Sequence, residues 1–112
     1  MKFLFINDNG DWLRSLGRIF SGRDNVVFAE CHSIDEALVA ISEHNPDVIF
    51  LDHSLTEGGI EGLDVARQLE DSGIKIYSTS ANSGVRDQYA KLGISHIRPN
   101  DLAWFRKIIE QK

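Results

Sequence analysis

The chain alternates strand-like and helix-like segments five times, and no other sequence feature restricts its fold as strongly. Short apolar runs without polar interruption are typical of strands that are buried on both faces. The predicted strands cover residues 2–8, 26–29, 46–52, 74–79 and 94–98. Because each is followed by a segment with apolar residues at helical spacing, parallel strands joined by right-handed crossovers are expected. We predict an α/β fold with a doubly wound five-stranded parallel sheet in the order 2-1-3-4-5.

Helix boundaries follow from local signals. Ser33 and Glu36 form the pattern of a capping box, in which the Glu36 carboxylate is expected to accept from the Ser33 backbone. The predicted fourth helix, about residues 84–92, has few apolar anchors and should be among the least stable elements. Its anchors are Val85, Tyr89 and Leu92. In the last helix, the residues expected to face the sheet are Leu102, Phe105, Ile108 and Ile109.

Two carboxylates follow the first and third predicted strands. Asp8 ends the first apolar run and Asp52 ends the third. In the expected strand order these two neighbouring strands diverge at the topological switch point, where open α/β sheets bind ligands. Asp8 and Asp52 are therefore candidate site residues. The alternative that Asp52 only caps a turn stays open at this stage.

Neighbouring carboxylates repel each other, so a shared proton or a cation must join them. Oxygen ligands favour Mg²⁺ or Mn²⁺. The expected ligands are Asp8, Asp52, the side chain of Asn7 and a backbone carbonyl near Ser54. Such an ion would leave coordination positions for water and phosphate.

A carboxylate beside a bound Mg²⁺ can attack a phosphoryl group and form an acyl phosphate. The transferred group then needs donors around its oxygens. Ser80 follows the fourth predicted strand and offers a hydroxyl, while Arg98 ends the fifth and offers a guanidinium.

Along its whole length the chain resembles the receiver domains of two-component response regulators, which have a flavodoxin-like (βα)₅ fold. The resemblance is carried by Asn7-Asp8, Asp52, Ser80-Ala81 and Arg98-Pro99. It implies that Asp52 is the phosphoacceptor, Asp8 a direct metal ligand, Ser80 the hydroxyl that turns toward the phosphoryl group, and Arg98 its counter-ion. It also implies a histidine kinase or phosphotransfer protein as donor. A downstream protein of unknown identity would read the face built from helix four, strand five and helix five.

Several positions depart from the family pattern. Asn7 stands in place of the first acid, which should weaken metal binding, and Arg98 replaces a lysine, which changes reach and geometry. The loop at residues 55–62 lacks the usual proline and is slightly long. The position of the family's switch aromatic falls on Ser95, His96 or Ile97, none of which is Tyr or Phe.

Two alternatives remain. The segments 51–55, 62–65 and 80–84 also resemble a receiver-like group proposed to process cyclic phosphates. That group has a histidine where this chain has Thr79, and His53 should point away from Asp52, so a general acid or base is lacking. The other alternative is a pseudo-receiver that binds a partner without phosphorylation.

Composition narrows the classes of partner. The net charge of −5, without a run of Lys or Arg, argues against nucleic acid and anionic membranes. At 112 residues we expect a single domain over 1–112 without an output domain. The lone Cys31, predicted to be a core residue, and the absence of a signal peptide or membrane-spanning run indicate a cytoplasmic protein. The histidines show no metal-ligand spacing and are expected in loops or at the surface.

Overall fold

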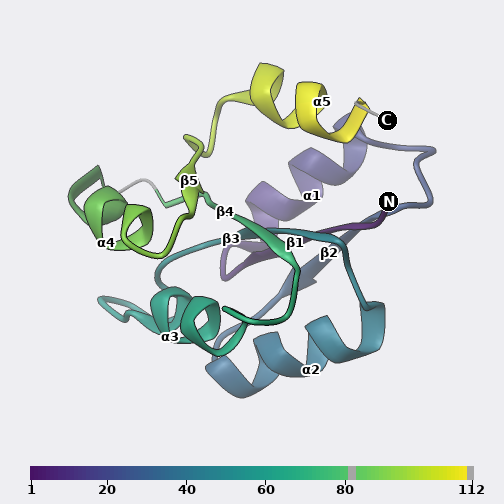
Figure 1. Ribbon diagram of the computed structural model, residues 1–112. Helices are drawn as coiled ribbons and strands as arrows, with labels where there is room; N and C mark the ends of the chain where they lie inside the picture. Colours follow the sequence, from purple (N-terminus) through teal and green to yellow (C-terminus); the bar gives the residue numbers. More distant parts are fainter. Residues whose placement is uncertain (81–82, 111–112) are drawn as a thin grey trace.

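The computed structural model describes residues 1–80 and 83–110. Its centre is a five-stranded parallel sheet in the order β2-β1-β3-β4-β5, as predicted. The strands are β1 (Phe3–Asn7), β2 (Val26–Glu30), β3 (Val48–Leu51), β4 (Lys75–Ser78) and β5 (Ser95–His96). The helices are α1 (Gly10–Ile19), α2 (Ile34–His44), α3 (Glu61–Gln68), the 3₁₀ turn η1 (Ser83–Val85), α4 (Arg86–Ala90) and α5 (Leu102–Glu110). Figure 1 shows α1 and α5 on one side of the sheet and α2 and α3 on the other.

The two faces of the sheet are chemically different. In β1, Phe3 and Phe5 belong to the core cluster under α1 and α5, whereas Leu4 and Ile6 belong to the cluster shared with α2, α3 and α4. This follows from the alternation of side chains along a strand. β3 repeats the pattern, with Phe50 on the first side and Leu51 on the second. One layer is therefore rich in aromatic rings and the other is mainly aliphatic.

Phe5 lies at the centre of the aromatic layer. Its ring stacks on Phe50 at a centroid distance of 4.4 Å and on Phe28 at 5.2 Å. Phe105 of α5 meets Phe5 edge-on at 5.4 Å. Because aromatic pairs add stabilisation beyond the area that they bury, this contact fixes α5 on the sheet. The expectation that Leu102 also faces the sheet was wrong, since 37% of this side chain is exposed.

The start of α2 differs in detail from the predicted capping box. Ser33 Oγ accepts from the Glu36 N–H at 3.0 Å, as expected. The Glu36 carboxylate, however, accepts from the His32 N–H at 2.6 Å. The reciprocal bond is therefore displaced by one residue, from the Ser33 N–H to the His32 N–H.

The connection between β4 and α5 contains the shortest elements. The 3₁₀ turn η1 leads into α4, which has five residues, and β5 has only two. Val85 and Tyr89 are buried and Leu92 packs beside them, so the predicted anchors of α4 are confirmed. Among the described residues, no helix is long and apolar enough to span a membrane.

Candidate functional site: a carboxylate pair at the switch point

Asp8 and Asp52 come together where β1 and β3 diverge from each other. Ile6 pairs with Leu51 in the parallel register, and the Asp52 N–H donates to the Ile6 carbonyl at 3.0 Å. The next residues of both strands therefore emerge at the same edge of the sheet. Both carboxylates are half-buried. The structure thus brings together the two acids that the strand ends predicted.

Burial and proximity change the acidity of this pair. The pKa of Asp52 is raised to about 7, first because burial disfavours its charged form, then because of the negative charge of Asp8 and a hydrogen bond with it. A backbone hydrogen bond from His53 acts in the opposite direction. Near neutral pH the pair consequently holds a proton that a cation can replace. This oxygen-only donor set fits a hard dication, since Mg²⁺ is typically bound by one or two carboxylates together with phosphate and water.

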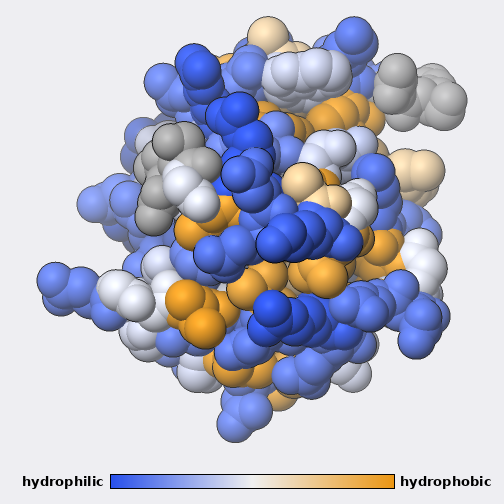
Figure 2. Space-filling view, turned by 60° about the vertical axis from the view of Figure 1, so that its left-hand side comes forward, coloured by the Kyte–Doolittle hydropathy of each residue, from blue (hydrophilic) through white to orange (hydrophobic). Residues whose placement is uncertain are grey.

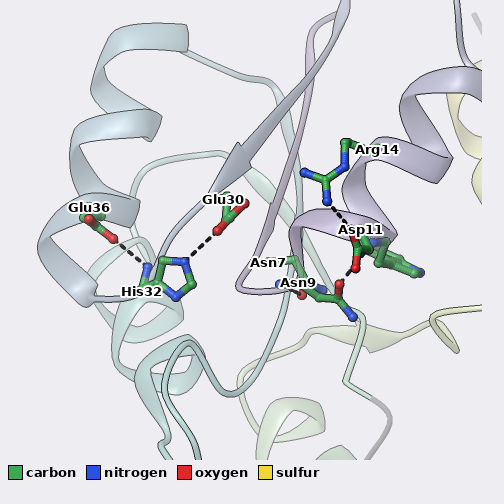
Figure 3. A network of polar contacts seen from close by, with 8 residues as sticks. Asn7, Asn9, Asp11, Arg14, Glu30, His32 and Glu36 are labelled. Atoms are coloured by element: carbon green, nitrogen blue, oxygen red, sulfur yellow. Dashed lines mark hydrogen bonds and ion pairs between the residues drawn. The ribbon is translucent and has the colours of Figure 1, made fainter.

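Asn7 is buried and orders the loop between β1 and α1. Its Oδ1 accepts from the Asn9 N–H at 2.9 Å, and Asn9 Oδ1 in turn accepts from the Trp12 N–H at 3.1 Å, capping α1. Figure 3 shows this sequence of contacts beside the ion pair of Asp11 and Arg14. The Asn7 oxygen has a second lone pair. Its predicted role as a metal ligand stays a prediction, whereas its structural role is visible.

A polar cavity of about 560 Å³ opens next to the carboxylate pair. It is lined by Asp8, Asn9, Gly10, Asp11, Arg14 and Glu30. Glu30 contacts the His32 ring at 2.9 Å (Figure 3), and this hydrogen bond raises the pKa of His32. A side chain at Gly10 would place its Cβ within 2.3 Å of the Glu30 carboxylate. The cavity therefore opens at the edge of the sheet beside Asp8, and Asp52 is not among the described residues that line it.

The loop after β3 is held by Glu61, a residue that the sequence analysis missed. The Glu61 carboxylate accepts from the Leu55 and Thr56 N–H groups at 2.9 and 3.2 Å, and from the Thr56 hydroxyl at 2.6 Å. The hydroxyl bond is the main cause that lowers the Glu61 pKa to about 2. Ser54, whose carbonyl is a predicted metal ligand, donates from its hydroxyl to the Gly59 carbonyl at 2.7 Å. An acid at the start of a helix after a glycine-rich loop was the available signal.

The structure places Ser80 and Arg98 in different surroundings. Ser80 is buried just beyond β4, next to Ser78 and Thr79, whose hydroxyls have no partner among the described residues. Ala81, its companion in the motif, lies outside the described residues. Arg98 is exposed and lines a cavity between α4 and α5. It is not among the groups that set the pKa of Asp52. The guanidinium is therefore directed to another site in this structure.

His53 lies in the loop after β3, as expected, but its side chain is buried. Its Nδ1 lies 2.8 Å from the Tyr89 hydroxyl, and burial lowers the His53 pKa. Gly62 leaves room for the pair, because a Cβ there would lie 2.7 Å from the Tyr89 hydroxyl and 2.2 Å from the Asp52 carbonyl. The residue after Asp52 is thereby connected to α4.

The histidines and carboxylates do not form a larger metal cluster. Within residues 1–80 and 83–110, no group of three or more His, Cys, Asp or Glu side chains could hold a metal ion. A metal at Asp8 and Asp52 would therefore depend on amide, carbonyl, water and phosphate oxygens for its remaining ligands.

Comparisons with known proteins agree with this geometry. The model of the response regulator receiver domain matches residues 3–97. A signal receiver domain of a DNA-binding response regulator from Colwellia psychrerythraea has a TM-score of 0.78 at 17% identity, with 99% of this chain and 96% of that chain covered. The BeF₃-activated receiver domain of Klebsiella pneumoniae RstA has a TM-score of 0.77 at 21% identity, with 99% and 100% covered. The receiver domain of Brucella abortus NtrX has a TM-score of 0.74 at 20% identity, with 99% of this chain and 100% of that chain covered. No curated protein matches the chain.

Proposed function

The chain belongs to the response regulator receiver domain family, and on this basis we propose that it accepts a phosphoryl group on Asp52. The donor is a histidine kinase or a phosphotransfer protein, and the reaction depends on Mg²⁺ or Mn²⁺. The observation that carries the proposal is the pairing of Asp8 with Asp52 at the switch point, where the pKa of Asp52 is raised. Two half-buried carboxylates side by side repel each other, and acids with such perturbed pKa values cluster at functional sites.

In the proposed reaction an Asp52 carboxylate oxygen attacks the phosphorus of a phosphohistidine. The P–N bond breaks, the imidazole leaves with the electron pair, and Asp52 becomes an acyl phosphate. Asp8, Asp52, the Asn7 oxygen and the Ser54 carbonyl would hold the dication. When bound, the metal neutralises charge on the carboxylates and the phosphoryl oxygens. The Ser80 hydroxyl would donate to one of these oxygens.

Arg98 would have to change its position to take part in this reaction. To neutralise the phosphoryl group, its side chain would have to leave the cavity between α4 and α5. This movement of Arg98 would alter the exposed surface formed by α4, β5 and α5, and signalling would follow from that change. The hydrogen bond between His53 Nδ1 and the Tyr89 hydroxyl offers a second mechanical connection between Asp52 and α4. A partner protein would read this face.

Intact mass spectrometry tests the proposal. After incubation with acetyl phosphate and Mg²⁺, we expect the mass of the chain to rise by one phosphoryl group. Asp52→Asn and a chelator should each abolish the increase, whereas Asp71→Asn, a change of an exposed acid elsewhere, should leave it intact.

Failure with both acetyl phosphate and a phosphorylated phosphotransfer protein would contradict the proposal. Hydrolysis of a cyclic nucleotide by the same sample would then favour cyclic-phosphate processing. If neither reaction occurs, a binding-only pseudo-receiver is favoured.

A further inference from the structure

We propose that the groove between α4 and α5, along the outer edge of β5, binds an extended acidic segment of a partner protein. The inference rests on the proposed function in one respect, because it assigns a partner chemistry to the face through which signalling is proposed. The groove itself is present in the unphosphorylated chain.

The groove has a definite floor and two walls. It is a cavity of about 600 Å³ whose floor is the continuous run 93–98. Arg86 and Ala90 of α4 form one wall, and Asp101 and Trp104 form the other at the start of α5. Figure 1 shows β5 between these two helices at the end of the sheet. The volume lies within the range of ligand pockets, which is about 300–1,000 Å³.

β5 offers an unpaired strand edge to this groove. It is the last strand of the sheet and pairs only with β4. The Ile97 N–H donates to the Ser78 carbonyl at 2.8 Å, so Ile97 directs its backbone groups toward β4. Because these directions alternate along a parallel strand, the N–H and C=O of His96 point outward. An extended peptide can hydrogen-bond to such an edge, as in β-augmentation.

The charged residues that line the groove favour an acidic segment as its ligand. Arg86 and Arg98 are both exposed at the groove, and neither makes an ion pair with any described residue. Among the described lining residues Asp101 alone has a carboxylate, and this group accepts from the Trp104 N–H at 3.3 Å. The groove thus has two free guanidinium groups among its described residues, and both can bind carboxylates.

This local positive charge contrasts with the net charge of −5 of the chain. Screening limits the influence of the distant acids, since the Debye length is about 8 Å at physiological ionic strength. Figure 2, turned to bring the α4 side of the molecule forward, shows hydrophilic residues separated by apolar patches. A second copy of the chain is a poorer occupant, because a two-fold contact would bring the arginines of both grooves together. An alternating acidic and apolar strand fits both the edge and the charge.

The test uses the blocked peptide Ac-Glu-Val-Glu-Val-Glu-NH₂ and its Gln-for-Glu counterpart, each titrated into ¹⁵N-labelled unphosphorylated protein. We expect the acidic peptide to shift the amide signals of residues 93–98 and of α4. Arg86→Gln should weaken its binding about two- to fivefold, the usual range for an exposed ion pair. The control Arg106→Gln, an exposed change on α5 outside the groove, should leave binding unchanged. The Gln peptide should bind more weakly than the Glu peptide.

Equal binding of the two peptides, shifts confined to another face, or no shifts would overturn the groove proposal. Concentration-dependent shifts of the same residues without peptide would instead assign the face to a second copy of the chain. The phosphorylation assay separates the two proposals, because Arg86→Gln should still take up one phosphoryl group. Absence of peptide binding with normal phosphorylation refutes only the groove, and the reverse result refutes only the phosphoryl chemistry.

Discussion

At the scale of single residues, the proposed chemistry and the surroundings of Asp52 favour opposite protonation states. As a nucleophile it must be ionised, yet burial and Asp8 favour its protonated form. Its pKa of about 7 in the folded chain lies above the ordinary value of 3.8. The stabilisation that this proton provides is complete below pH 3.8 and disappears as the pH rises through 7. The folded protein therefore becomes less stable over this interval on account of Asp52.

Replacing this acid should remove that pH dependence. We predict that Asp52→Asn raises the free energy of unfolding at pH 8 by roughly 2 kcal/mol, after discounting for partial exposure, and changes it little near pH 4. Urea denaturation at both pH values measures the effect. Mg²⁺ should raise the stability of the wild-type chain at pH 8 much more than that of the variant. Asp71→Asn is the control, and an equal gain in that variant would show that only net charge matters.

The residues of the site were predictable to different degrees. Asp8 and Asp52 could be found because strand ends in a doubly wound sheet converge at one edge, whatever the side-chain details. The contact of His53 could not be predicted, because its partner Tyr89 depends on the placement of α4. Glu61 was missed although a local signal existed, because its partners depend on the path of the loop. Arg98 could lie at the carboxylate pair or in the cavity between α4 and α5, and sequence spacing does not decide between these two positions.

At the scale of elements, α4 is fixed by a small number of contacts. Its five residues are too few for an independently stable helix. Tyr89 is fully buried, and its hydroxyl is the polar partner of His53. Loss of this hydroxyl would leave a buried imidazole nitrogen without a partner.

We predict that Tyr89→Phe lowers the free energy of unfolding by about 1–3 kcal/mol, the cost of an unsatisfied buried polar group. Amide hydrogen exchange in α4 should accelerate more than in α1 or α2. Tyr77→Phe is the matched control, since the Tyr77 hydroxyl makes no hydrogen bond within the described residues. If both variants behave alike, the contact between His53 and Tyr89 does not hold α4.

Element boundaries were predicted well where the signals are local. Ser33 caps α2 as expected, and Asn9 caps α1 in the same way, because a cap acts within three residues. β5 is shorter than the predicted strand 94–98, since only Ser95 and His96 pair with β4 in the parallel register. The exposure of Leu102 reflects the angle at which α5 meets the sheet, which periodicity alone does not contain.

At the scale of the whole molecule, stability should decrease from the centre of the sheet toward β5. β1 pairs on both sides and lies between the aromatic and aliphatic layers, whereas β5 pairs on one side over two residues. The overall topology was predictable because right-handed crossovers and buried strands leave few alternatives. The distribution of stability was only partly predictable, since it depends on tertiary contacts.

Phe5→Leu tests this gradient. Removing the central ring should cost about 1–3 kcal/mol and accelerate hydrogen exchange in the slowest amides of β1 and β3, which open only on global unfolding. The fastest amides of α4 should change little, because they already exchange by local opening. A uniform acceleration in all elements would indicate that α4 and β5 unfold together with the rest of the sheet.

The fluorescence of the two tryptophans can distinguish a change in the interior from ligand binding in the groove. The Trp12 indole N–H donates to the Pro99 carbonyl at 3.0 Å, and its ring meets Phe5 and Phe105 edge-on. Trp104 is 49% exposed in the groove, with Lys107 Nζ 4.9 Å from its ring centre. Trp12 should thus emit at shorter wavelength and report the seating of the β5–α5 connection, while Trp104 should emit at longer wavelength and respond to groove ligands. The unlabelled chain therefore carries separate optical reporters for its interior and for its docking face.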